Sequence, residues 1–258
     1  LHQDSVRLAL FYQPSSRSGY NTRQQLSNET IMENNPSMQG KICLVTGGTS
    51  GIGLATAWQL ARLDATVVIT ARDETRGREA LEKIRQKSGS MNVHLLMADF
   101  SSLEDTRKLA AAFQAQFPAL HVLINNAGTI APKRQVSQDG YELQFAVNHL
   151  APFLLTNLLL PLIKTSAPAR IITVSSMVHS WGNIDLNDLQ TAKGYDPSAV
   201  YAMTKLANML FTVELARRLE DSGVTANCLH PGVIDTKLYR GYMGMPGSNS
   251  ADEDQLED

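Results

Sequence analysis

The chain has 258 residues, of which 43% are hydrophobic and 19% charged, and its formal net charge at pH 7 is −2. Near-neutral charge argues against a nucleic-acid-binding protein that works by neutralising phosphates, and two cysteines are too few for a disulfide scaffold. The longest mostly apolar run, Leu150 to Ile163, is shorter than a bilayer span and is interrupted by Pro152, Asn157 and Pro161. We therefore expect a globular protein with no membrane span and no nucleic-acid partner.

Both ends of the chain differ in composition from the middle. Residues 1–39 are rich in Ser, Asn, Gln and Thr without a sustained apolar period, and they predict a disordered N-terminal extension. A run from Val6 to Tyr12 resembles part of a targeting peptide, but Arg7 interrupts it and it lacks the apolar length of a signal peptide. Met32 offers an alternative start of the protein. Residues 241–258 hold five acidic and no basic side chains and predict a flexible acidic tail.

Between these ends, over about residues 40–240, short apolar runs alternate with helical patterns. Strands are expected at 41–46, 66–70, 93–97, 120–124, 170–174 and 224–229. Helices are expected at 52–63, 73–87, 102–117, 139–160 and 198–219. Apolar strands separated by helices are typical of a parallel sheet that is covered on both faces. We predict one α/β domain with a doubly wound, mostly parallel sheet of the Rossmann type, in the strand order 3-2-1-4-5-6.

The two cysteines lie in strands that are not neighbours in this order. Cys43 falls in the first predicted strand and Cys228 in the sixth, so a disulfide between them is not expected. Both are interpreted as small apolar residues in a reducing compartment, and we expect a cytoplasmic protein.

The turn that follows the first strand is rich in glycine. Gly47, Gly51 and Gly53 occur where a strand passes into a helix, which is the context that a dinucleotide-binding fingerprint requires. Small residues here let main-chain amides approach a pyrophosphate, and the positive end of the helix dipole faces that charge. A purely structural turn is the alternative. The predicted cofactor contacts in this turn are Thr46, Gly47, Thr49, Ser50, Gly51, Ile52 and Gly53.

The end of the second strand bears on the choice between NAD and NADP. A fold that prefers NAD places an acidic residue there for the ribose 2′-hydroxyl. In this sequence Thr70 and Ala71 occupy that place, and Arg72 follows. A guanidinium can hold a 2′-phosphate with two parallel hydrogen bonds. We therefore predict NADP(H) rather than NAD(H), although Arg72 also fits a solvated residue at the start of a helix.

Two more strand ends carry candidate cofactor contacts. Asp99 closes the third strand, where a carboxylate can accept a hydrogen bond from an adenine amino group, but Asp is also an ordinary residue before a helix. Small residues after the fourth strand can let the backbone lie against the cofactor, and the Asn side chains there can also tie strands together. The predicted contacts at these two ends are Asp99, Phe100, Asn125, Ala127 and Gly128.

Tyr201 and Lys205 form the strongest candidate pair for catalysis. Four residues apart on a helix, both side chains rise from one face. A free phenol has a pKa of roughly 10, too high for a good base at neutral pH, and a neighbouring ammonium lowers that pKa by favouring the phenolate. The same spacing also occurs by chance, so the weight of the pair depends on what lies near it.

Two polar residues are predicted to lie near this pair. Ser176 follows the fifth strand, and a hydroxyl at the carboxyl end of a strand points into the crevice where ligands bind. There it can hydrogen-bond a carbonyl oxygen. Asn148 lies in an apolar stretch of the long helix and needs partners if buried, which a water relay to Lys205 can supply. The candidate catalytic set is therefore Asn148, Ser176, Tyr201 and Lys205.

In their order along the chain, these motifs resemble those of the short-chain dehydrogenase/reductase family, over about residues 40–240. The segments that carry the resemblance are Thr46–Gly53, Asn125–Gly128, Asn148, Ser176, Tyr201 with Lys205, and Pro231–Thr236. Residues 147–156 and 205–211 are similar to the retinol dehydrogenase-like branch of that family.

The resemblance implies a role for each of these residues. Tyr201 would act as acid and base, Lys205 would bind the nicotinamide ribose and lower the Tyr pKa, and Asn148 would belong to a proton relay. Ser176 would orient the substrate oxygen, and its spacing to Tyr201 selects it over Ser175. Tyr201 and Lys205 would thus contact the cofactor as well. The segment after the sixth strand would contact the nicotinamide carboxamide through Pro231, Gly232, Val233 and Thr236.

The sequence departs from the family near its C-terminus. Family members continue past the Pro-Gly segment through substrate-covering helices to a seventh strand, whereas 22 residues without a strand-like run follow Thr236 here. Either the sequence is truncated or the sheet ends at its sixth strand, and the seventh strand is missing from the predicted fold. A homodimer through the helices at 139–160 and 198–219 stays open.

The sequence therefore favours an oxidoreductase that transfers a hydride between NADP(H) and a small-molecule alcohol or carbonyl. Met177, Trp181 and Met203 indicate an apolar substrate, unless they only pack. A non-catalytic NADP-binding module is the alternative. A sugar-epimerase-type relative is disfavoured, because those enzymes space their glycines differently and add a C-terminal domain. No metal site is expected, since metal-ligand spacing is missing at His94, His121, His149, His179 and His230.

Overall fold

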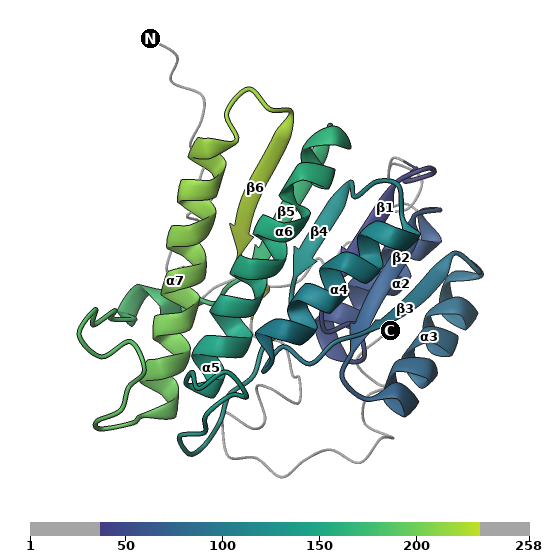
Figure 1. Cartoon of the computed structure of the whole chain (residues 1–258). Coiled ribbons are helices and arrows are strands. Elements are labelled where there is room, and N and C mark those ends of the chain that lie inside the picture. The colour runs from purple at the N-terminus through teal and green to yellow at the C-terminus, as the bar shows by residue number, and fades with distance from the viewer. Residues whose placement is uncertain (1–36, 233–258) are drawn as a thin grey trace, which may run out of the picture. The chain divides into compact units, whose positions relative to one another are not determined.

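The computed structural model describes residues 37–232, so most of the predicted extension and the whole predicted acidic tail lie outside the described residues. Strands and helices alternate along this part of the chain (Figure 1). The strands are β1 Ile42–Val45, β2 Thr66–Ala71, β3 Val93–Met97, β4 Val122–Asn125, β5 Ala169–Val174 and β6 Val224–Leu229. The longer helices are α2 Gly51–Arg62, α3 Glu74–Ser88, α4 Leu103–Gln116, α6 Ala151–Thr165 and α7 Pro197–Arg218. The shorter ones are α5 Leu143–Phe145, the π-helical turn η1 Ala146–Leu150 and the 3₁₀ helix η2 Met177–Trp181.

The six strands form one sheet in the order β3-β2-β1-β4-β5-β6, and every neighbouring pair is parallel. This confirms the predicted doubly wound Rossmann-type fold. The strand order reverses between the parallel neighbours β1 and β4, because the chain continues from β1 to β2 on one side and from β4 to β5 on the other. Their carboxyl ends therefore open a crevice at the reversal point, where folds of this type bind ligands.

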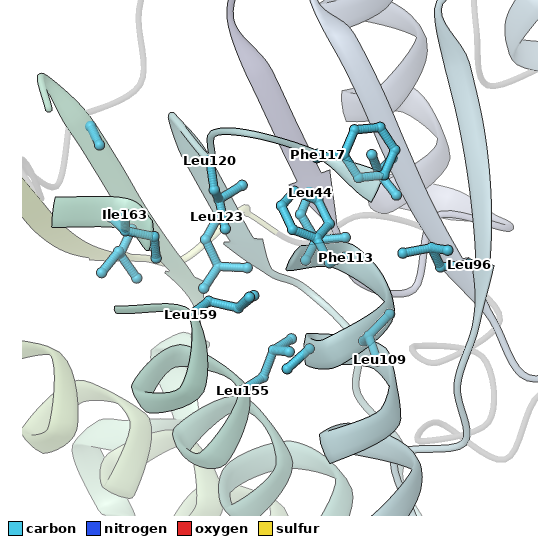
Figure 2. Packing of buried hydrophobic residues seen from close by; sticks show 14 of the residues in the cluster. Leu44, Leu96, Leu109, Phe113, Phe117, Leu120, Leu123, Leu155, Leu159 and Ile163 are labelled. Atoms are coloured by element: carbon cyan, nitrogen blue, oxygen red, sulfur yellow. The ribbon is translucent and has the colours of Figure 1, made fainter. Parts of the chain in front are cut away.

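Alternate residues of the central strand face the two layers of helices. Leu44 packs with α4, α6 and α7 in one buried cluster, part of which Figure 2 shows. Cys43 and Val45, on either side of it in β1, pack with α2 and α3 in a second cluster. All three side chains are fully buried. Because both faces are covered, the strand needs a continuous apolar run, which is the pattern that predicted it.

The predicted long helix at 139–160 begins later and ends later than expected. Glu142 caps the helical segment through its carboxylate, which accepts hydrogen bonds from the backbone N–H groups of Gln144 and Phe145 at 3.0 and 2.7 Å. The helix then continues through Pro161 to Thr165, and beyond the proline it buries Ile163 completely. This buried side chain offsets the backbone hydrogen bond that proline cannot make.

Among residues 37–232, one helical stretch, Leu143–Thr165, is long and apolar enough to cross a membrane, judged by its length and composition alone. Three of its side chains, Leu155, Leu159 and Ile163, are fully buried against the sheet (Figure 2). The apolar side of α6 therefore packs on the sheet, beside α4 in the same layer of helices.

The two cysteines are free, as expected from their strands. In the sheet, β4 and β5 separate β1, which carries Cys43, from β6, which carries Cys228. Burial raises the pKa of Cys43 to about 12 and also raises the pKa of Cys228. Both side chains are therefore protonated thiols at neutral pH.

Candidate active site

The glycine-rich turn between β1 and α2 leaves room only for backbone. Gly47 and Gly51 have φ angles of +69° and +53°, which side chains rarely adopt. A Cβ atom at Gly48 would lie 2.7 Å from the Cβ of Ile69, and one at Gly53 would collide with the carbonyl oxygen of Gly47. The turn thus packs its own backbone tightly and presents main-chain groups at the carboxyl end of β1.

The N-terminus of α2 has no side-chain cap. Ser50 occupies the N-cap position without making a cap hydrogen bond, and the first turn holds no acidic residue. By contrast, the N-caps Asp73, Ser102 and Asp196 of α3, α4 and α7 each accept a bond from a backbone N–H. The first N–H groups of α2 therefore suit an anion such as a pyrophosphate. A nicotinamide dinucleotide fits this turn, since the glycines would let its phosphates approach these amides.

Hydrogen bonds fasten this turn to the neighbouring strand ends. The Thr46 hydroxyl accepts from the backbone N–H groups of Asn126 and Ala127, both at 3.0 Å. In return the Asn126 side chain donates to the Thr46 carbonyl at 2.8 Å. From β2, the Thr70 hydroxyl accepts from the Gly47 N–H at 3.1 Å. The predicted cofactor contacts did not include Asn126 and Thr70, but Asn side chains after the fourth strand were expected to tie strands together, and Asn126 does so.

Three residues that were predicted to contact the cofactor make contacts within the protein. Asn125 is buried and its side chain donates to the Thr156 hydroxyl of α6 at 2.9 Å, so it ties β4 to a helix. Phe100 is buried in the core cluster of α4 and α6. The Asp99 carboxylate accepts from the Ser101 N–H at 2.9 Å, which matches the alternative interpretation as a residue before a helix. Of these, Asp99 is the one that also stays partly exposed.

Arg72 lies at the exposed end of β2. The two preceding residues, Thr70 and Ala71, are buried, and Thr70 is bonded to Gly47 as described above. The next residue, Asp73, uses its carboxylate to cap α3 through the Arg76 N–H at 2.8 Å. The side chain available to a ligand beyond β2 is therefore a cation.

Lys205 is buried on α7 and is joined to the end of β5. Its ammonium donates to the Val174 carbonyl at 2.9 Å and lies 5.3 Å from the centroid of the Tyr201 ring. The predicted pair thus shares one face of the helix. Burial lowers the pKa of Lys205 to about 8, and the nearby Cys228 acts in the opposite direction. The ammonium group therefore becomes able to release its proton near neutral pH.

The two serines after β5 have different roles. The Ser175 hydroxyl is buried and donates to the Lys205 carbonyl at 2.9 Å, which makes a second bond between β5 and α7. Ser176 is partly exposed and caps η2 through the Val178 N–H at 3.5 Å. At the end of η2, a Cβ on Gly182 would lie 2.5 Å from the Ala202 carbonyl, so this short helix packs against α7 beside Tyr201. Of the two hydroxyls, that of Ser176 is therefore the one accessible from the crevice, and its catalytic role stays a prediction.

Asn148 lies in the π-helical turn η1 and is buried. Its side-chain oxygen accepts from the Thr129 N–H at 2.7 Å, and its NH₂ group donates to the Thr129 carbonyl and the Thr204 hydroxyl at 2.9 and 3.2 Å. The expected partner was a water relay to Lys205, but protein groups bind this amide. The oxygen still lies near Lys205, because both border the space beside the exposed Gly128.

The segment after β6 is described only as far as Gly232, so Val233 and Thr236 lie outside the described residues. Pro231 is partly exposed, and Gly232 is exposed with a φ angle of +91°. Because β6 is parallel to β5, these two residues leave the sheet at the same edge as Ser176. Met203, which we expected to line a substrate site, instead lies buried with Phe145 and Val200.

The buried Lys205 predicts a specific dependence of stability on pH. Because its pKa falls from the ordinary lysine value of 10.5 to about 8 in the folded chain, the unfolded chain binds more protons between these pH values. The free energy of unfolding, compared with that of a Lys205→Met variant, should therefore rise from pH 8 to pH 10.5 and stay level below pH 8. Urea denaturation across this pH range measures the free energy of unfolding. The matched control is Lys164→Met, since Lys164 is exposed. A difference that stays constant with pH would contradict the burial of a titrating ammonium.

Comparison with known proteins agrees with this geometry. The family model described as "short chain dehydrogenase" matches residues 41–243. Human retinol dehydrogenase 14 is 44% identical over 216 residues, which cover 79% of this chain and 64% of that protein. Mouse polyprenol dehydrogenase is 44% identical over 211 residues, covering 80% and 63% respectively. The chain thus spans a little under two thirds of the length of these relatives.

Among solved structures, the complex of RhlG with NADP from Pseudomonas aeruginosa superimposes with a TM-score of 0.66 at 30% identity, covering 81% of this chain and 79% of that one. The family match extends over most of the described residues, from before β1 to beyond β6. The chain therefore belongs to the short-chain dehydrogenase family, whose members are oxidoreductases that bind a nicotinamide dinucleotide.

Proposed function

We propose that the chain uses NADP(H) to interconvert an apolar alcohol and its carbonyl compound, with Tyr201 as the acid and base. The observation that carries this proposal is the bond from Lys205 to the Val174 carbonyl at 2.9 Å. It brings α7 to the carboxyl end of β5, so that the Tyr201 phenol and the Ser176 hydroxyl leave neighbouring elements at one edge of the sheet.

Each of these side chains has a chemical task in carbonyl reduction. Ser176 donates a hydrogen bond to the carbonyl oxygen and stabilises the negative charge that develops there. Tyr201 donates its proton to the same oxygen, which completes the alcohol. Lys205 keeps a positive charge beside the phenol and so favours the phenolate that remains. When bound, NADPH supplies the hydride that reduces the carbonyl carbon, and oxidation of the alcohol reverses these events.

A route for returning the proton runs past Gly128. The side-chain oxygen of Asn148 lies 3.4 Å, and the Lys205 ammonium 3.8 Å, from the position that a Cβ of Gly128 would take. Because Gly128 has no side chain and is exposed, a water molecule can enter between these two groups. Asn148 would then orient this water, and Lys205 would pass its proton toward Tyr201.

The cofactor would lie along the crevice from β2 to β6. The turn residues Thr46, Gly47, Thr49, Ser50, Gly51, Ile52 and Gly53 would face its pyrophosphate. Asp99 would reach the adenine, Ala127 and Gly128 would contact it through their backbone, and Pro231 and Gly232 would lie near the nicotinamide. Arg72 would bind the 2′-phosphate of NADP. The RhlG structure, a complex with NADP, supports this choice of cofactor.

The substrate class is supported by exposed apolar side chains next to Ser176. Met177 and Trp181 of η2 are 57% and 54% exposed, although both are large and apolar. A patch of this kind beside a reacting hydroxyl suits an apolar substrate. The names of the two relatives, a retinol and a polyprenol dehydrogenase, point to apolar alcohols as well.

The proposal includes a homodimer, in which exposed apolar side chains of α6 and α7 contact a second copy of the chain. Phe153 on α6 and Leu210 and Val213 on α7 are 45%, 50% and 63% exposed, and rings of α6 and α7 pack together at Phe153 and Phe211. Two such helices from each copy would bury a continuous apolar face. A reducing compartment such as the cytoplasm is part of this proposal, and the free thiols of Cys43 and Cys228 are compatible with it.

Replacing Tyr201 tests the chemistry directly. Tyr201→Phe removes the proton donor but keeps the ring, so kcat for NADPH-dependent reduction of apolar aldehydes should fall by about 10² or more, while NADPH binding persists. Tyr141→Phe, on an exposed side chain, is the matched control and should keep full activity. Unchanged turnover in Tyr201→Phe would refute the assignment. A wild-type chain that binds NADPH but turns over no carbonyl compound would instead indicate the non-catalytic NADP-binding module.

Replacing Arg72 tests the cofactor preference. Arg72→Ala removes a charged hydrogen-bond donor, so the Kd for NADPH should rise by about tenfold or more, with little change for NADH. Isothermal titration with both cofactors measures the ratio, and Arg107→Ala on the exposed side of α4 controls for the lost charge. Equal losses for NADPH and NADH would show that Arg72 does not bind the 2′-phosphate.

Sedimentation velocity tests the dimer. The wild-type chain should sediment as a dimer, and Leu210→Glu with Val213→Glu should shift it to a monomer, because the charges would be buried at the interface. The matched control Leu186→Glu changes an equally apolar side chain that is 80% exposed elsewhere and should leave the dimer intact. A wild-type monomer at micromolar concentration would contradict this surface.

A further inference from the structure

The backbone carbonyl of Asn148 lacks its ordinary helical donor. In an α-helix the N–H four residues later would bond to it, but that residue is Pro152, which has no N–H. The turn widens here to the π form, in which the Ala151 N–H bonds to the Ala146 carbonyl. The NH₂ group of Asn208 on α7 donates to the Asn148 carbonyl at 2.8 Å. A side chain of the neighbouring helix thus replaces the missing backbone donor.

The oxygen of the Asn208 side-chain amide contacts a histidine. The side-chain oxygen of Asn208 lies 3.0 Å from Nδ1 of His149. Because a carbonyl can only accept, the Asn208 nitrogen must face Asn148, and the Asn208 oxygen must therefore face His149. An amide oxygen in turn needs a donor, so the proton of a neutral His149 ring belongs on Nδ1. Burial lowers the pKa of His149 and so favours the neutral ring.

Simple packing does not explain these two polar residues. Asn208 is 2% exposed, and the His149 ring stacks on Phe145 with centroids 5.5 Å apart. An apolar pair would fill the same space without the cost of burying polar groups. The hydrogen bonds from His149 to Asn208 and from Asn208 to Asn148 satisfy these groups in series. The series ends on Asn148, whose side-chain oxygen and the Lys205 ammonium both border the space beside Gly128.

We propose that Asn208 and His149 are positioning residues that hold Asn148 in its π turn, and so hold the polar path between Asn148 and Lys205. This inference rests on the proposed function, because the path matters only if Lys205 serves Tyr201. It assigns no contact with substrate or cofactor to either residue. Their effect should therefore appear in kcat, while the KM for NADPH stays unchanged.

Nitrogen NMR of the histidine rings tests the hydrogen-bond series without any turnover. In the full chain without cofactor, the His149 ring should be the Nδ1–H tautomer, identified by the signals that disappear in His149→Asn. In Asn208→Leu this preference should be lost, because the accepting oxygen is gone. A wild-type Nε2–H tautomer would overturn the inference, since Asn208 could not then be oriented as described.

Kinetics of matched variants test the positioning role. His149→Leu and Asn208→Leu should each lower kcat by about tenfold, and the double variant should be no worse than Asn208→Leu because both act on one series. His149→Asn, whose side-chain NH₂ can replace the Nδ1–H, should recover most of the activity. Additive losses, or a His149→Asn variant as impaired as His149→Leu, would overturn the role.

These measurements distinguish a failure of the proposed function from a failure of the positioning role. A wild-type chain without turnover would remove the proposed function and the positioning role with it, whereas the tautomer would still decide whether the hydrogen-bond series exists. If the wild-type chain is active and the Asn208→Leu variant is fully active as well, the positioning role is wrong, whereas the proposed function still holds. Thermal unfolding of each variant shows whether a loss of kcat reflects a loss of folded protein.

Discussion

The burial of the Lys205 ammonium is the constraint on which the site depends. A buried charge without a partner is costly, and here the partner is the Val174 carbonyl at the end of β5. The bond from Ser175 to the Lys205 carbonyl adds a second contact between the same strand and helix. Helix α7 is thereby fixed along the strand end, which sets where Tyr201 can project. A change in either bond would move the phenol relative to Ser176.

The same physical rule acts across the whole edge of the sheet. Polar side chains at the strand ends bond to backbone or to other side chains: Thr46 to the turn after β4, Thr70 to Gly47, and Asn125 to Thr156 of α6. Such bonds satisfy many of the buried polar groups at the strand ends, whereas Asn125 Oδ1 and Thr173 Oγ1 are buried without a hydrogen-bond partner among the described residues. The bonds restrain the strand ends, which suits a site that must hold reacting groups at fixed distances. The exposed groups that remain, Arg72, Gly128 and Ser176, are those that face a ligand in the proposal.

The sequence predicted the sheet well because its central strands are buried on both faces, while the edge strands β3 and β6 are partly exposed. Six apolar runs and their order along the chain were enough for the Rossmann topology, and the spacing of Tyr201 and Lys205 placed both on one helical face. Local detail at Asn148 was beyond such patterns. Its helix was expected at 139–160, whereas Glu142 sets the start and Pro152 removes a backbone donor, and a 3.6-residue period does not reveal a π turn. The partners of Asn148, namely Thr129, Thr204 and Asn208, come from distant segments of the chain, so only the folded structure reveals them.

Residue type alone did not reveal the direction of a side chain. Met203 was expected either to mark an apolar substrate site or only to pack, and it packs with Phe145. The Asn125 side chain donates to Thr156 of α6, so its direction depends on how β4 and α6 lie against each other. Of the two serines, Ser175 makes a structural bond to the Lys205 carbonyl, and the role of Ser176 stays a prediction.

The arrangement of Tyr201, Ser176 and Lys205 is best tested by a crystal structure of the chain with NADP⁺ and an apolar alcohol. We expect the hydroxyls of Ser176 and Tyr201 both to lie within hydrogen-bond distance of the alcohol oxygen, while the Lys205 ammonium still bonds to Val174. A Tyr201 side chain that points away from the bound alcohol, or a Lys205 that leaves the strand end in the complex, would refute this arrangement.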